Sequence, residues 1–191
     1  AQGESIGWRS RQGLADAANQ FHYYRRSADN RILWGGYDAI YYAGGRVAAE
    51  NQHRAGTYIT LANNFFATFP QLEGIGFSHR WGGVIDTCSR FSPFWGPAYD
   101  GRVAYVAGYT GLGVGATRFG ADVMLDLLDG RPTQRTSLQM VSSKPLPFPP
   151  EPVRTGVIAL TRRSIAAADA NGGRRNLWLQ TLDRLGLGFD S

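Results

Sequence analysis

The chain has 191 residues, which is enough for one large domain or two small ones with a sizeable core. No apolar run approaches the length of a membrane span, which argues against a membrane-spanning helix. The single cysteine, Cys88, excludes an internal disulfide and a cysteine-based zinc cluster, and it favours a reducing, cytoplasmic location. The three histidines, at positions 22, 53 and 79, lack the spacing of metal ligands, so no metal site is predicted.

The net charge of +5 arises entirely in the C-terminal third of the chain. Residues 131–191 carry nine basic and four acidic side chains, whereas residues 1–130 are balanced. A binding module whose basic C-terminal helices dock an acidic partner is one interpretation of this excess. Arginine pairs on the solvent-facing side of short helices are the more common cause, and nucleic-acid binding is not predicted.

The first half of the chain predicts a hairpin followed by a helix. Residues 21–27 and 31–42 are aromatic, β-favouring runs on either side of a turn at Asp29-Asn30, a pattern typical of an antiparallel hairpin. Gly35-Gly36 in the second run indicates a bulge or a close backbone approach to a ligand. Residues 57–69 then place six apolar side chains on one helical face that we expect in the core: Tyr58, Leu61, Ala62, Phe65, Phe66 and Phe69.

The middle of the chain combines patterns typical of strands with patterns typical of loops and turns. Residues 77–85 have the character of a strand containing Gly82-Gly83, and Pro93 and Pro97 bracket a predicted loop. Asp100-Gly101 is a hairpin-type turn that leads into a short apolar strand at 103–107.

A glycine-rich turn at 108–115 joins this strand to a predicted helix at 113–129. The helix carries its apolar residues on one face, at positions 114, 117, 121, 124, 125 and 128, and stops at Gly130. Such a strand–turn–helix unit presents backbone N–H groups and a positive helix end to an electron-rich ligand. Beyond it, five prolines between 145 and 152 predict an extended segment, and two short helices are expected near 156–169 and 176–185.

The turn contains a possible dinucleotide-binding motif. Residues 111–116, Gly-Leu-Gly-Val-Gly-Ala, fit the G-x-G-x-x-A pattern between a strand and a helix. A dinucleotide-binding unit also needs an acidic residue at the end of its second strand. The candidate second strand, 137–142, runs into Ser143 and Lys144 without a carboxylate, which disfavours a nicotinamide-dependent Rossmann enzyme.

Three segments resemble flavoprotein oxidoreductases of the D-amino-acid oxidase, glycine oxidase and sarcosine oxidase type. Residues 106–116, Val-Ala-Gly-Tyr-Thr-Gly-Leu-Gly-Val-Gly-Ala, are similar to the strand and turn that return late in that family to the FAD domain. Residues 80–86, Arg-Trp-Gly-Gly-Val-Ile-Asp, resemble the family's tryptophan-glycine segment beside the flavin. Residues 32–38, Ile-Leu-Trp-Gly-Gly-Tyr-Asp, resemble a substrate-domain strand.

The resemblance implies an α+β fold: a mixed or antiparallel substrate-domain sheet with helices, plus the last strand and helix of an FAD-binding domain. We expect one sheet built from residues 20–43 and 75–107, with the 57–69 helix on one face and the 113–129 helix on the other. Residues 1–100 would belong to the substrate domain, 101–130 to the FAD domain, and 131–191 to a proline-rich linker and basic helices.

The resemblance also implies a function and a site. The intact enzyme would oxidise a C–N bond of an amine or amino acid with FAD, and this chain would be its C-terminal portion, inactive without the N-terminal half. Candidate substrate-binding residues are Tyr37, Tyr41 and Arg80, whereas no catalytic residue is assigned. Candidate cofactor-binding residues are Trp81, Gly82, Gly108, Gly111, Leu112, Gly113 and Val114.

Some features of the family are missing or ambiguous in this sequence. Leu33 and Trp34 stand where some relatives carry a catalytic lysine, so lysine-assisted oxygen activation is not expected. Cys88 lies several residues past the position of a flavin-tethering cysteine, and a buried structural cysteine is the alternative that we favour. Arg90 is a candidate ion-pair partner of Asp86.

Overall fold

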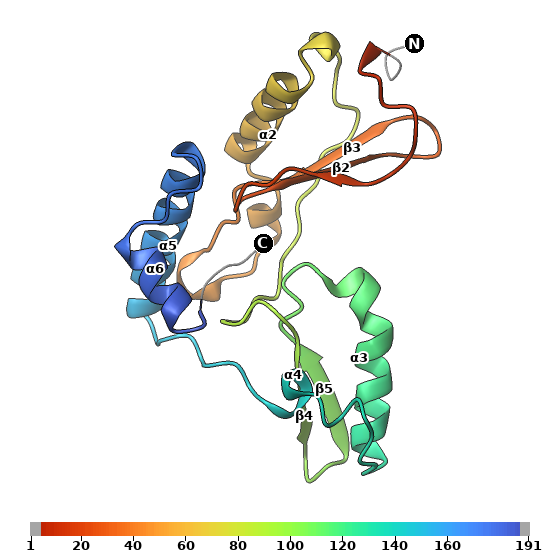
Figure 1. Cartoon of the computed structure of the whole chain (residues 1–191), viewed down its shortest axis with the longest axis vertical. Helices are drawn as coiled ribbons and strands as arrows, with labels where there is room; N and C mark the ends of the chain where they lie inside the picture. Colours follow the sequence, from red (N-terminus) through yellow and green to blue (C-terminus); the bar gives the residue numbers. More distant parts are fainter. Residues whose placement is uncertain (1–4, 188–191) are drawn as a thin grey trace. The chain divides into compact units, whose positions relative to one another are not determined.

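A computed structural model describes residues 5–187, which form two compact units. The first unit consists of residues 5–83 and 155–180, and the second of residues 84–154 and 181–187. Helices and small antiparallel sheets occur together, so the predicted α+β class is confirmed (Figure 1). No helix of the described residues is long and apolar enough to cross a membrane.

The sheet of the first unit is antiparallel, with the strands in sequence order: β1 (Leu14–Ala15), β2 (His22–Arg26) and β3 (Ile32–Gly36). Strands β2 and β3 form the predicted hairpin, in which Tyr24 lies opposite Trp34. Asn30 adopts a φ of 63° in the connecting turn, a conformation that asparagine tolerates better than most residues. The sequence prediction of this hairpin is therefore confirmed.

Helix α2 (Ala55–Thr68) supplies the aromatic core of the first unit, after two short 3-10 helices, η1 (Ala43–Gly45) and η2 (Ala49–Gln52). Phe65 is only 1% exposed, and its ring contacts that of Trp34 edge-on at 5.6 Å between centroids. The Phe69 ring lies 6.0 Å from the same indole. A further 3-10 helix, η3 (Pro70–Leu72), follows and buries Leu72. The aromatic face of α2 is core, as predicted.

Two C-terminal helices, α5 (Val153–Ala170) and α6 (Leu177–Arg184), lie close to their predicted positions. The indole N–H of Trp178 donates to the Thr161 hydroxyl at 2.9 Å. Asn176 links the pair, because its amide nitrogen lies 2.9 Å from the Ser164 hydroxyl and its Oδ1 accepts the N–H of Leu179 in the first turn of α6. These contacts fix α6 along α5.

The second unit contains a two-stranded antiparallel sheet, β4 (Phe94–Ala98) and β5 (Val103–Ala107), with helix α3 (Gly113–Leu128) packed along it (Figure 1). Its core consists of Trp95, Val123 and Val141, which are at most 6% exposed. Val141 comes from the short helix α4 (Gln139–Ser142). The predicted strand 103–107 and helix 113–129 are confirmed.

Four other predictions about the elements are wrong. The expected loop between Pro93 and Pro97 is strand β4, because the edge of a two-stranded sheet tolerates a proline. Residues 77–85 form no strand and leave apolar side chains exposed, and residues 139–142 are helical instead of extended. The single expected sheet is replaced by two separate sheets.

The face of α3 that contacts the sheet also differs from the apolar face in the sequence. Val114 is 98% exposed and Leu125 is 61% exposed, although both belong to that apolar face. The buried positions are Gly120, Val123 and Asp126. Glycine at 120 lets the helix approach closely enough for its carbonyl to accept the Trp95 indole N–H at 3.2 Å. A glycine carries no hydrophobic signal, so periodicity alone selects the wrong face.

Candidate functional site

The turn between β5 and α3 has an unusual backbone. Gly108, Thr110 and Gly111 have φ values of 78°, 52° and 85°. The left-handed region is available to glycine at little cost, but a β-branched threonine there is a genuine outlier. Such strain persists only where the surrounding structure imposes it, and it concentrates at ligand-binding sites. The turn is thus a candidate site on geometry as well as on sequence.

Asp86 imposes this conformation. Its carboxylate accepts the N–H of Gly108 at 2.5 Å, and its carbonyl accepts the N–H of Thr110 at 2.8 Å. The Thr110 hydroxyl donates to the Gly108 carbonyl at 3.1 Å. A Cβ at position 108 would lie 2.9 Å from the sulfur of Cys88, so only glycine fits there. Gly108 is buried and uses its N–H for Asp86, so it supports the turn from within.

The N-terminus of α3 is open. Among residues 5–187 no side chain caps it, and its first turn contains no acidic residue. Leu112 is 65% exposed, and a Cβ built on Gly111 or Gly115 would meet no atom within 4 Å. The first N–H groups of a helix lack partners within the helix and lie at its positive end. This end therefore suits an electron-rich ring or an anion placed against the backbone.

Tyr109 connects the turn to the body of α3. A Cβ on Gly120 would clash with the Tyr109 hydroxyl, so the phenol occupies the space that this glycine leaves. Burial raises the pKa of the Tyr109 phenol above its ordinary value. The position of the glycine turn is thus coupled to the packing of the helix that follows it.

Residues 80–83 of the tryptophan-glycine segment belong to the first unit, and residues 84–86 belong to the second. Arg80 places its guanidinium over the Tyr58 ring, 5.4 Å from the centroid, and Trp81 is 63% exposed. A Cβ on Gly82 would lie 2.5 Å from the carbonyl oxygen of Gln52, so this glycine allows the segment to run against η2. Trp81 is available for a ligand, and Arg80 is held by a cation–π contact.

The candidate substrate residues Tyr37 and Tyr41 are half-buried and follow β3. Asp38, next to Tyr37, forms an ion pair with Arg54 at 2.8 Å, at the start of α2. Arg80 reaches the same end of α2 through Tyr58. The segments that carry Tyr37 and Arg80 therefore both contact the N-terminal end of α2. The spacing of these residues in the sequence does not indicate that they lie at the same helix end.

The two units divide the predicted cofactor residues. Trp81 and Gly82 lie in the first unit, and the set from Gly108 to Val114 lies in the second. Sequence reasoning missed the roles of Asp86 and Thr110, because a lone Asp or Thr carries no signal for a backbone contact. The sequence indicates Asp86 only as the last residue of the tryptophan-glycine segment and as a candidate ion-pair partner of Arg90.

Arg90 and Cys88 both make contacts that stabilise the fold of the second unit. Arg90 donates to backbone carbonyl oxygens instead of pairing with Asp86: those of Ser92, Pro93, Met140 and Ser143. It thereby joins the loop before β4 to α4. Cys88 is 7% exposed, with its sulfur 3.1 Å from the Ser92 carbonyl oxygen.

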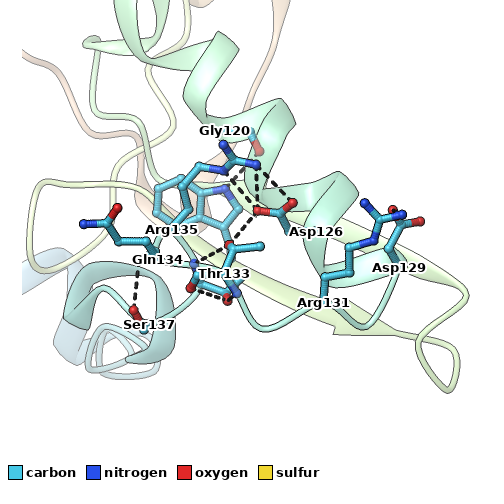
Figure 2. A network of polar contacts seen from close by, with 10 residues as sticks. Gly120, Asp126, Asp129, Arg131, Thr133, Gln134, Arg135 and Ser137 are labelled. Carbon is cyan, nitrogen blue, oxygen red and sulfur yellow. Dashed lines mark hydrogen bonds and ion pairs between the residues drawn. The ribbon is translucent and has the colours of Figure 1, made fainter.

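A polar network closes the C-terminal end of α3. Arg135 contacts both carboxylate oxygens of Asp126 at 3.0 Å, and the Thr133 hydroxyl donates to the same group at 2.7 Å (Figure 2). The hydrogen bond from Thr133, followed by those from Arg135, holds the pKa of Asp126 below its ordinary value. The network holds the segment after α3 against the helix.

Comparison with known proteins identifies the family. The sequence model for FAD dependent oxidoreductases matches residues 3–127, about two thirds of the chain. The chain therefore belongs to the FAD dependent oxidoreductase family, and the family implies an FAD cofactor.

Curated relatives agree with this assignment. The chain is 34% identical to gamma-glutamylputrescine oxidoreductase of Escherichia coli over 109 residues, which are 56% of this chain and 23% of that protein. It is 27% identical over 108 residues to a probable oxidoreductase OrdL of Haemophilus influenzae, covering 56% of this chain and 22% of the relative. A Rhizobium meliloti protein of the same description is 24% identical over 136 residues, or 71% and 29% of the two chains.

The chain thus spans less than a third of the length of these relatives. No solved structure matches it significantly.

Proposed function

We propose that this chain forms part of an FAD-dependent oxidoreductase that oxidises a C–N bond of an amine or amino acid. The observation that carries the proposal is the strained glycine turn leading into an uncapped helix N-terminus, within the region matched by the family. Gamma-glutamylputrescine, named in a relative 34% identical to the chain, is the first amine to test.

FAD, when bound, would supply the two-electron redox chemistry of this oxidation. The N–H groups of Gly111, Gly113 and Val114 would hold the edge of the cofactor that gathers negative charge, assisted by the helix dipole. The Leu112 N–H donates to the Tyr109 carbonyl at 2.9 Å and would stay there. Trp81 and Gly82 are the candidate cofactor contacts in the first unit. The Gly108 N–H would stay on Asp86 and keep the turn in its strained shape.

Three side chains of the first unit would bind the substrate. Tyr37 and Tyr41 would form apolar walls with hydrogen-bonding tips. Arg80 would hold a substrate carboxylate through paired hydrogen bonds, for which its guanidinium is well shaped. No residue of this chain is proposed to move a proton in the reaction.

We also propose that residues outside this chain complete the cofactor site, since the chain spans 22–29% of the lengths of its relatives. The 191-residue chain alone is then expected to bind FAD poorly and to lack activity. Gel filtration of the purified chain after incubation with FAD tests this. Flavin absorbance that co-elutes with the chain would contradict it.

A cytoplasmic location, inferred from the single cysteine, belongs to the same proposal.

Anaerobic mixing of the FAD-loaded enzyme with gamma-glutamylputrescine tests the activity. Loss of the absorbance of oxidised flavin is expected, since the amine would deliver two electrons to the cofactor. A panel of amines and amino acids that leaves the flavin oxidised would reject the proposed substrate class.

The alternative, a module that docks an acidic partner through its basic C-terminal helices, is less well supported. Several arginines of the C-terminal third bind groups within the chain: Arg131, Arg135, Arg154 and Arg162. Much of the basic excess is thus used internally.

A further inference from the structure

The corner that follows β3 has the most strained backbone of the first unit. Gly36, Tyr37 and Asp38 have φ values of 111°, 46° and 65° in succession. A Cβ at position 36 would collide with the Phe21 carbonyl oxygen, so glycine is obligatory. Tyrosine rarely adopts positive φ, and such a conformation persists only when neighbouring groups fix it. The contacts of Tyr37 and Asp38 show which groups those are.

The ring of Tyr37 is held by His22. The two rings are stacked, with centroids 5.5 Å apart and planes 4° apart. His22 is itself fixed, because Nδ1 lies 2.6 Å from the Asp16 carboxylate and Nε2 lies 3.0 Å from the Asn64 amide nitrogen. The Tyr37 N–H donates to the Phe21 carbonyl at 3.3 Å. The aromatic ring therefore has a defined place against the hairpin.

Asp38 is held by two arginines, one at the N-cap of α2 and one within α5. Its Oδ2 lies 2.8 Å from Arg54, which immediately precedes α2, and its Oδ1 lies 2.9 Å from Arg162 in the middle of α5. The carboxylate is 20% exposed and the Arg162 side chain 32% exposed, so both charges are partly removed from water. Removing one partner of such a pair leaves the other charge poorly solvated.

A second contact attaches α5 to the hairpin region. The carboxylate of Asp169 accepts the N–H groups of Asn19 and Gln20, at 2.8 and 3.0 Å. Helix α5 therefore holds the chain just before β2 and just after β3. The family match ends at residue 127, so α5, which supplies one partner of each contact, lies outside the matched region.

We infer that Arg162 is a positioning residue of the substrate site: through Asp38 it holds the corner after β3 in the conformation that stacks Tyr37 on His22. This inference rests on the proposed function, which assigns Tyr37 to the substrate wall. Under this inference, α5 influences substrate binding through Asp38 and does not contact the substrate itself. Without Arg162, Asp38 would keep only Arg54, and the corner that carries Tyr37 would open more often.

The test compares Arg162→Gln with Arg163→Gln, which makes the same charge change at the exposed neighbouring position. Amide hydrogen exchange of residues 36–45 is expected to be about tenfold faster in Arg162→Gln, the size expected for losing one charge-assisted hydrogen bond, and unchanged in Arg163→Gln. Asp38→Asn should accelerate the same amides. Arg162→Lys should restore part of the protection, and thermal unfolding verifies that each variant is folded.

Steady-state kinetics of the FAD-loaded enzyme with gamma-glutamylputrescine supply the second readout. Arg162→Gln is expected to raise KM about tenfold, with FAD content unchanged and kcat less affected, whereas Arg163→Gln keeps wild-type constants. Unchanged exchange in Arg162→Gln would overturn the inference. Faster exchange with unchanged KM would overturn the role in substrate binding. If the wild-type enzyme leaves every amine unoxidised, the proposed function fails, and the exchange data still decide whether Arg162 holds the corner.

Discussion

At the scale of single residues, Asp86 decides the shape of the glycine turn. Its carboxylate satisfies the N–H of buried Gly108, and its carbonyl satisfies Thr110, the one β-branched residue with positive φ among the described residues. A buried N–H without a partner is expensive, so the turn and Asp86 depend on each other. The sequence shows the glycines but gives no indication of the residue that constrains them.

Asp86→Ala should therefore lower the free energy of unfolding by about 1–3 kcal/mol, because the Gly108 N–H would lose its acceptor. Asp129→Ala is the control, since Asp129 belongs to an exposed ion pair of 3.4 Å with Arg131 and should cost little. Urea unfolding followed by circular dichroism measures both. Equal stability of the two variants would show that Asp86 does not hold the turn.

At the scale of elements, the effect of replacing a glycine of α3 on stability depends on what the added methyl group would contact. Gly120→Ala should destabilise the protein by roughly 1–3 kcal/mol, because its methyl group would displace the Tyr109 phenol. Gly115→Ala should stabilise it by about 0.5–1 kcal/mol, because its methyl group meets open space and alanine favours a helix. Thermal unfolding of the two variants shows whether each one is stabilised or destabilised. A stabilising Gly120→Ala would contradict the close approach of Tyr109.

The Asp126 network at the C-terminal end of α3 should make the free energy of unfolding depend on pH in the acidic range. The pKa of Asp126 lies below the ordinary value of 3.8, so this group contributes stability above that pH and loses it as pH falls through the lowered pKa. Asp126→Asn should be less stable than the wild type at pH 7, and the difference should shrink below about pH 4. Urea midpoints measured from pH 7 to pH 3 test this. A difference that is constant with pH would exclude ionic stabilisation by Arg135.

Several elements could be predicted from the sequence because their signals are local. The β2–β3 hairpin has a turn at Asp29-Asn30, and α2 has an aromatic face ended by a proline. Strand β4 was missed because Pro97 normally argues against a strand, and the buried face of α3 was missed because its central residue is Gly120. Contacts across long sequence distances, such as Asp38 with Arg162, leave no pattern that one sequence reveals.

At the scale of the whole molecule, the proposed cofactor residues lie in both units and the substrate residues in the first. The glycine motif and the tryptophan-glycine segment could be recognised in the sequence as belonging to a flavoprotein. The open helix end and the strained turn supply physical support that does not depend on the sequence resemblance. The central claim is that backbone N–H groups at the start of α3 hold FAD.

Replacing Val114 with proline tests that claim most directly. Val114 is 98% exposed at the second position of α3, where proline removes one N–H while the first turn of a helix tolerates it. Val114→Ala keeps the N–H and is the matched control. FAD affinity of the enzyme containing this chain, measured by titration, should fall roughly tenfold in Val114→Pro and stay unchanged in Val114→Ala. Wild-type affinity in a folded Val114→Pro variant would contradict the account.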